Sequence, residues 1–204
     1  MDLIIMFLGK MMRNTKIDYE KLFNNGVLWA LNFCSEQFQI EAIKQHKGVI
    51  IGFIKNPSKK VQLESVKRFG ISISSIDDPD EDVQLEAVNQ NHWALYHIKD
   101  PSERVQLAAV KTNVDAINLI NNPSETIKLA VVKKEGAAIQ WLKNPSEEIQ
   151  FEAIKQDAAS IQYIKNPTEK VQLEILEQNF ELGRAITNPT EKIKDKFLKL
   201  RAFQ

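Results

Sequence analysis

The seven prolines of this 204-residue chain occur at a constant spacing, and no other feature restricts the fold as strongly. Successive prolines are 22 residues apart from first to last, without an insertion or deletion. A fixed period of this length is typical of stacked-repeat proteins, in which each unit is too small to bury its own apolar face and shares a core with its neighbours. The prolines are Pro57, Pro79, Pro101, Pro123, Pro145, Pro167 and Pro189.

The repeat continues upstream of the first proline in a diverged form. Cys34–Ile43 matches Pro145–Ile154, with one inserted residue before Pro57, and a more diverged unit is expected over Arg13–Phe33. We therefore expect four parts along the chain. These are an N-terminal cap or extension at 1–12, two diverged repeats at 13–56, six regular repeats at 57–188, and a C-terminal half-repeat capping helix at 189–204.

The residues around each proline predict the start of a helix. Asn or Asp precedes every proline, Ser or Thr usually follows it, and Glu comes next in six of the seven units. An Asn or Asp side chain can accept hydrogen bonds from the first free amides, proline fits the first helical position, and an acidic residue suits the helix dipole. We predict as helix N-caps Asn56, Asp78, Asp100, Asn122, Asn144, Asn166 and Asn188.

Each long helix is expected to run about three turns and to be followed by a shorter helix, α or 3₁₀, such as Ala116–Ile120. At about 100° per residue, Val105 and Ala109 occupy one sector of the long helix, while Leu107 and Val110 occupy another. Two apolar sectors require two neighbours, so each helix packs on the preceding and following repeats. The sequence thus predicts an all-α fold, an α-solenoid of about eight 22-residue two-helix repeats.

A polar residue recurs between the two apolar sectors of the long helix. We interpret it as an interior hydrogen-bond ladder that ties each repeat to its neighbour's loop, because a buried amide must be satisfied. The alternative is a polar groove. The ladder residues are Gln62, Gln84, Gln106, Gln150 and Gln172.

The residue before the second apolar anchor of each short helix varies, although the anchors do not. Equivalent positions align in a solenoid at about 8 to 10 Å per layer, so large side chains there form a stripe suited to protein recognition. The alternative is that the rings only seal the edge between consecutive short helices. In one unit Trp93 and Tyr96 add two more large side chains to the short segment that contains His97. The candidate partner-binding residues are Trp93, Tyr96, His97, Leu119, Trp141 and Tyr163.

Charge and cysteine content favour some classes of protein over others. The chain has 27 Lys plus Arg and 27 Asp plus Glu, so it lacks the net positive charge typical of a general nucleic-acid binder. A single cysteine excludes an internal disulfide and favours a reducing compartment. The apolar run Leu3–Leu8 is too short to span a bilayer, so no membrane association is expected.

The sequence contains no phosphate-binding glycine loop, zinc-protease motif or paired-cysteine motif, so no enzyme and no cofactor are expected. His46, His92 and His97 do not share a helical face and are not expected to bind metal. Cys34 takes the proline slot at a predicted helix start, where a thiolate would be favoured, yet a small structural filler is the preferred interpretation.

The segment Asp100–Val110, DPSERVQLAAV, resembles the leucine-rich repeat variant and, more loosely, HEAT repeats. It is most similar to a family of short NPSEEVQLEAV repeats of unknown function from intracellular bacteria and large viruses or phages. The resemblance covers Cys34–Leu200. It implies a right-handed superhelix of alternating α and short, partly 3₁₀, helices, and it implies no catalytic residue.

These observations favour a non-enzymatic binding module that scaffolds or occludes a protein partner. The resemblance suggests a viral or bacterial effector or inhibitor in the cytoplasm, the host cytoplasm if viral. The alternative is nucleic-acid binding on a concave face through lysines such as Lys55, Lys99, Lys143 and Lys165, which otherwise suit the dipole of a preceding helix. A third possibility is self-assembly through Lys192–Phe203, whose apolar residues Ile193, Phe197, Leu198 and Phe203 have no following repeat.

Overall fold

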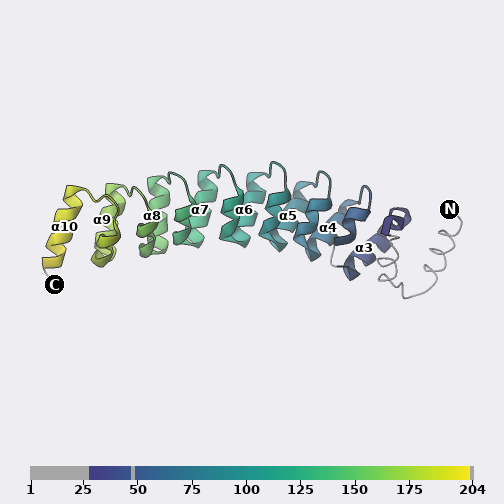
Figure 1. The fold of residues 1–204 in the computed structure, drawn as a ribbon, viewed down its shortest axis with the longest axis horizontal. Coiled ribbons are helices and arrows are strands. Elements are labelled where there is room, and N and C mark those ends of the chain that lie inside the picture. Colours follow the sequence, from purple (N-terminus) through teal and green to yellow (C-terminus); the bar gives the residue numbers. More distant parts are fainter. Residues whose placement is uncertain (1–27, 47–48, 203–204) are drawn as a thin grey trace. The chain divides into compact units, whose positions relative to one another are not determined.

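The computed structural model describes residues 28–46 and 49–202, and within these ranges it contains no β-strand. The predicted N-terminal cap at 1–12 and most of the first diverged repeat lie outside the described residues. Long α-helices alternate with 3₁₀ helices, labelled η, along the chain (Figure 1). The elements are η1 (Leu28–Phe33), α3 (Glu36–Gln45), η2 (Val49–Phe53), α4 (Lys59–Arg68), η3 (Gly70–Ser75), α5 (Glu81–Gln90), η4 (His92–His97), α6 (Glu103–Thr112), η5 (Val114–Leu119), α7 (Glu125–Lys134), η6 (Gly136–Trp141), α8 (Glu147–Gln156), η7 (Ala158–Tyr163), α9 (Glu169–Gln178), η8 (Phe180–Ala185) and α10 (Glu191–Ala202).

The chain divides into two compact units, residues 1–90 and 91–204. In the first unit α4 packs on α3 and on α5, and η3 follows η2 in the layer of short helices. In the second unit α6 to α10 pack in chain order, and η4 to η8 form a parallel layer (Figure 1). Each unit is therefore a stack of two-helix repeats, which confirms the predicted all-α solenoid. The short helices are 3₁₀ rather than α.

The core of each repeat comes from a few apolar positions that recur with the 22-residue period. In α6, Val105, Ala109 and Val110 are buried, and the equivalent α8 residues Ile149 and Ile154 are fully buried. Each fully buried aliphatic side chain of this size stabilises the fold by about 1.5 to 3 kcal/mol. No repeat buries both of its apolar sectors alone, so this stabilisation depends on adjacent repeats.

The helix starts lie two residues beyond the predicted position. The Ser or Thr after the proline is the N-cap, and its hydroxyl accepts a hydrogen bond from the third helical amide, as from Ile149 N–H to Ser146 Oγ at 3.4 Å. Asp80 does the same for Val83. The prediction that the residue before the proline is the N-cap is wrong at every described unit. The residues wrongly predicted as N-caps are Asn56, Asp78, Asp100, Asn122, Asn144, Asn166 and Asn188. The observed N-caps are Ser58, Asp80, Ser102, Ser124, Ser146, Thr168 and Thr190.

Most of these Asn and Asp residues serve a conformational role instead. Five of the seven have φ between 47° and 52°, in the left-handed region that Asn and Asp tolerate better than other residues with a side chain. Proline follows, and it disfavours the α region for the residue before it. The Asn or Asp therefore makes the sharp bend that leads the chain into the next helix. The five are Asn56, Asp78, Asp100, Asn144 and Asn188.

Threonine substitutions at Asn144 and Ser146 distinguish the residue that forms the bend from the residue that caps the helix. Ser146→Thr should change stability by less than about 0.5 kcal/mol, because threonine can also cap, whereas Ser146→Ala should cost about 1 kcal/mol. Asn144→Thr should cost about 1 to 2 kcal/mol, because a β-branched residue is strained at positive φ. Urea denaturation followed by circular dichroism measures all three. Equal stability of Asn144→Thr and wild type would contradict the assigned bend.

The first residue of a long helix links to the start of the next repeat. Ser58 Oγ donates to Glu36 Oε2 at 2.6 Å, and Ser124 donates likewise to Glu103. Lys192 Nζ lies 2.6 Å from Glu169 Oε1 in the corresponding place. The Ser58 hydroxyl, followed by Lys60, lowers the pKa of Glu36, so this link contributes at neutral pH and is lost as the pH falls. The links are exposed, so each adds little stability.

The predicted glutamine ladder is confirmed in part. In all five units the side-chain amide donates to the carbonyl of the proline five residues earlier, at 2.7 to 3.0 Å, which closes the loop of its own repeat. Gln150 and Gln172 also accept a backbone hydrogen bond from the following repeat. The expected bond to a neighbouring repeat is wrong for the other three, Gln62, Gln84 and Gln106.

Two further expectations concern the diverged ends of the repeat. Gln39 donates to Cys34 O at 3.4 Å, the bond that glutamine makes to proline elsewhere, so Cys34 occupies the proline slot as predicted. In α10, Ile193 is buried and Phe197 lies 6.5 Å from Phe180 between ring centroids. These two apolar residues are therefore covered, and Leu198 is exposed. Phe203 lies outside the described residues.

Candidate interaction surface

One face of residues 91–204 is built from the short helices and the extended segments that follow them. Each 3₁₀ helix ends at a residue with extended backbone angles, such as Leu142 (φ −91°, ψ 128°) and Ile164 (φ −89°, ψ 107°). Leu142 and Ile164 are buried, and the two residues after each, Lys143-Asn144 and Lys165-Asn166, are exposed. We call Ile98–Asp100, Ile120–Asn122, Leu142–Asn144 and Ile164–Asn166 the connectors. They recur once per repeat, so they line up across this face.

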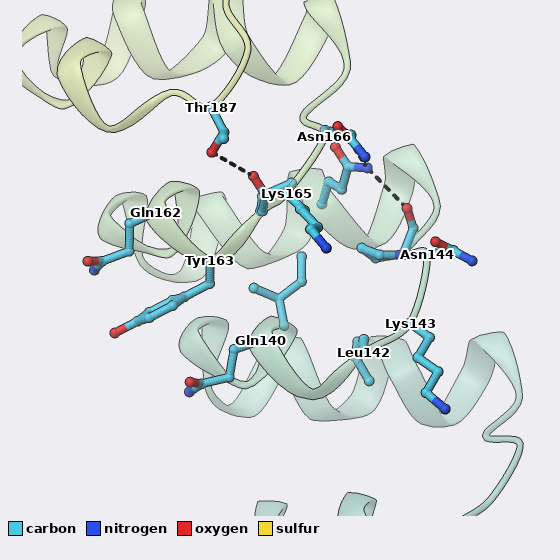
Figure 2. Close-up of a pocket in the computed structure, with 13 residues that line it drawn as sticks. Gln140, Leu142, Lys143, Asn144, Gln162, Tyr163, Lys165, Asn166 and Thr187 are labelled. Carbon is cyan, nitrogen blue, oxygen red and sulfur yellow. Dashed lines mark hydrogen bonds between the residues drawn. The ribbon is translucent and has the colours of Figure 1, made fainter.

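A groove lies between each pair of consecutive connectors. The first, of about 700 Å³, is bounded by Tyr96 and Leu119, and the second, of about 500 Å³, contains Trp141. The third, of about 750 Å³, contains Tyr163 (Figure 2). The first two share the segment Ile120–Asn122, and the last two share Leu142 and Lys143. The three grooves therefore adjoin and form one trough across four repeats.

The aromatic residues predicted as a recognition stripe divide into two groups. Tyr96 is 74% exposed, Trp93 54% and Tyr163 41%. His97 is also exposed, and its ring packs edge-on against Tyr96 with centroids 5.3 Å apart. Trp141 and Leu119 are half-buried. The exposed group is therefore accessible to a partner, whereas the half-buried pair also fills space between short helices.

The trough brings together four of the six predicted residues. Tyr96, Leu119, Trp141 and Tyr163 line its grooves. Trp93 and His97 lie on the same short helix as Tyr96 but line none of these three grooves. His92 packs on Trp93 with ring centroids 5.4 Å apart, so η4 carries two ring pairs, His92–Trp93 and Tyr96–His97.

The structure adds a row of carboxamides that the sequence argument missed. Asn118, Gln140 and Gln162 occupy the penultimate position of η5, η6 and η7, are exposed, and line the grooves. They make no hydrogen bond with the described residues. Figure 2 shows Gln140 and Gln162 extending from neighbouring short helices on the same side as Tyr163. Their 22-residue spacing was visible in the sequence, but exposed amides resemble an ordinary solvated face.

The charge in the trough is unevenly distributed. The third groove contains Lys143 and Lys165 and no carboxylate, and the second contains Lys128 and Lys143 and no carboxylate. Lys128 Nζ forms a salt bridge with Glu125 Oε1 at 2.7 Å. Lys143 and Lys165 form no salt bridge with the described residues. The first groove contains one acid, Asp100. The trough therefore becomes positive toward α9.

Other candidate chemistry does not gather at this face. No group of three or more His, Cys, Asp and Glu side chains that could hold a metal occurs within residues 28–46 and 49–202. Burial raises the pKa of the Cys34 thiol, so the protonated thiol is favoured there. Every helix in the described ranges is too short or too polar to cross a bilayer.

No family model matches the chain, and no curated protein or solved structure matches it.

Proposed function

We propose that this chain is a non-enzymatic helical-repeat protein that binds a protein partner along the trough of residues 91–204. The observation that carries the proposal is the recurrence of one groove at three successive repeat junctions, each with a large side chain at its edge. Aromatic residues at an accessible, concave surface are the residues that most often dominate protein binding. A long, shallow trough suits occlusion or scaffolding better than enclosure of a small substrate.

The experiment compares partner capture with stability on the same protein samples. Full-length tagged chain is used for affinity purification from its native cell, and bound proteins are identified by mass spectrometry. A triple variant is made with Trp93→Ala, Tyr96→Ala and Tyr163→Ala. It should capture a specific partner at least about tenfold less well, because truncating interface aromatics commonly costs more than about 1 kcal/mol of binding free energy each. Thermal unfolding should change little, since these rings are exposed.

The matched control is Leu198→Ala, which removes an equally exposed apolar side chain from α10. It should leave capture unchanged. Trp141→Ala is expected to lower stability as well as capture, because Trp141 is half-buried. Unchanged capture by the triple variant, or equal loss with Leu198→Ala, would contradict binding through the trough.

Nucleic-acid binding is the second candidate, and the exposed side chains of Lys99, Lys143 and Lys165 favour it. At the equivalent positions Asn121 and Thr187 interrupt the row, so only Lys143 and Lys165 are on adjacent repeats. Phosphate contacts would release counterions, and binding to duplex DNA would fall steeply with rising salt. The absence of such binding at low salt would remove this candidate.

A further inference from the structure

The trough repeats similar grooves at three successive repeat junctions, and its lining offers hydrogen-bonding groups to an elongated ligand. Neighbouring grooves share lining residues, so an elongated occupant that crosses the connectors would contact more than one groove. Stacked helices are about 8 to 10 Å apart, and a polyproline II chain advances about 9.3 Å in each turn of three residues. Every third residue of such a chain would therefore meet an equivalent position of successive repeats.

The carboxamide row offers partners for a peptide backbone. Asn118, Gln140 and Gln162 each present a donor and an acceptor at the trough and have no hydrogen-bonding partner among the described residues. A peptide unit in polyproline II also has a free N–H and a free C=O, because this conformation has no internal hydrogen bonds. One carboxamide per repeat can therefore bind one peptide unit in every three, and these backbone contacts do not depend on the side chains of the ligand.

The positive charge of the third groove favours extended peptides that carry carboxylates. Lys143 and Lys165 are exposed on adjacent connectors, and no carboxylate lines the groove between them (Figure 2). They too are separated by one repeat, so carboxylates three residues apart on the ligand can pair with both at once. Tyr163 lines the same groove as Lys143 and Lys165, and Trp141 lines the neighbouring groove with Lys143, so apolar residues of the ligand can pack on these rings.

We infer that the trough binds an extended acidic peptide in the polyproline II conformation, with carboxylates at every third residue facing Lys143 and Lys165. The inference rests on the proposed function and specifies the partner's binding segment. It commits to a protein ligand, because the carboxamides match peptide units and the lysine row is too short to follow a nucleic-acid backbone.

The test measures binding of fluorescein-labelled peptides to the full chain by fluorescence anisotropy. A peptide of repeated Glu-Ala-Pro triplets should bind, and peptides of repeated Gln-Ala-Pro or Lys-Ala-Pro should bind at least about tenfold more weakly. A peptide with the same composition as the first but with its glutamates adjacent should also bind more weakly, because its carboxylates no longer match the repeat spacing. Equal binding of the two acidic peptides would overturn the predicted spacing.

Variants of the chain test the assigned lysines. Lys143→Glu with Lys165→Glu should weaken binding of the Glu-Ala-Pro peptide at least about tenfold. Lys111→Glu with Lys133→Glu makes the same change in net charge at exposed positions of α6 and α7, away from the trough. It should leave affinity within about twofold, since these charges are remote and screened. Circular dichroism checks that both variants are folded, and equal loss in both would overturn the site.

The remaining outcomes separate this inference from the proposed function. If no acidic peptide binds, but the triple aromatic variant still loses its captured partner, the acidic-peptide assignment is overturned and protein binding stands. Tighter binding of oligothymidylate than of the peptide, with a steep dependence on salt, would overturn both in favour of phosphate recognition. Loss of Glu-Ala-Pro and Gln-Ala-Pro binding in Gln140→Ala with Gln162→Ala would support the backbone contacts.

Discussion

Shortening Ile154 to alanine is expected to destabilise residues 91–204 by about 2 to 5 kcal/mol. Ile154 is fully buried in α8, at a position that is aliphatic in every regular repeat. Removing its outer carbons loses their transfer free energy and leaves a cavity that the packed neighbours fill only in part. Ile154→Val should cost about 0.5 to 1.5 kcal/mol, because it removes a single methylene.

Urea denaturation followed by circular dichroism measures these changes, with Leu198→Ala as the control. That control should stay within about 0.5 kcal/mol of wild type, since Leu198 is exposed. Repeats contact only their neighbours, so weakening α8 should also broaden the transition as cooperativity across the stack falls. A loss for Ile154→Ala no larger than that for Leu198→Ala would contradict the packing of α8.

The second large effect is expected for Gln150→Ala. Gln150 is 5% exposed, donates to Pro145 O at 3.0 Å and accepts from Thr168 N–H at 3.1 Å. Alanine leaves both backbone groups without this partner, at a cost of about 1 to 3 kcal/mol for each group that water cannot reach. The variant should therefore loosen both its own loop and the junction with the next repeat.

Gln106→Ala provides the comparison for this prediction. Gln106 is half-buried, and among the described residues its side chain bonds only to Pro101 O in its own repeat, so its loss should cost about 1 kcal/mol. Amide hydrogen exchange at Thr168 should accelerate in Gln150→Ala and stay unchanged in Gln106→Ala. Equal stability losses in the two variants, with no change in exchange, would show that the bond to the next repeat adds nothing.

The repeat, its two helices and its core could be predicted from the sequence because a strict period exposes the apolar positions. The helix start could not be fixed, because Asn144 and Ser146 are both good capping residues and stand on either side of one proline. What decides between them is the backbone: Asn144 has φ 47°, and Ser146 has the extended angles of an N-cap. Propensity alone does not carry that information.

The sequence predicted only part of the candidate surface. The varying row on the short helices led to Tyr163, and the segment around His97 led to Tyr96; both tyrosines are exposed. The sequence did not separate them from Trp141, because the exposure of a ring depends on the size of its neighbours in adjacent repeats. The grooves themselves arise between repeats and have no signature within any one of them.

The links from Glu36 to Ser58 and from Glu103 to Ser124 join residues 22 and 21 positions apart, so the same contact recurs at each junction of this kind. Duplication or deletion of one whole repeat would therefore leave the same type of contact at the junctions between the remaining repeats. The trough would gain or lose one groove, and in the complex that we infer the bound peptide would gain or lose about three residues of contact. For a protein built this way, copy number can adjust the length of ligand recognised while the chemistry of each subsite stays the same.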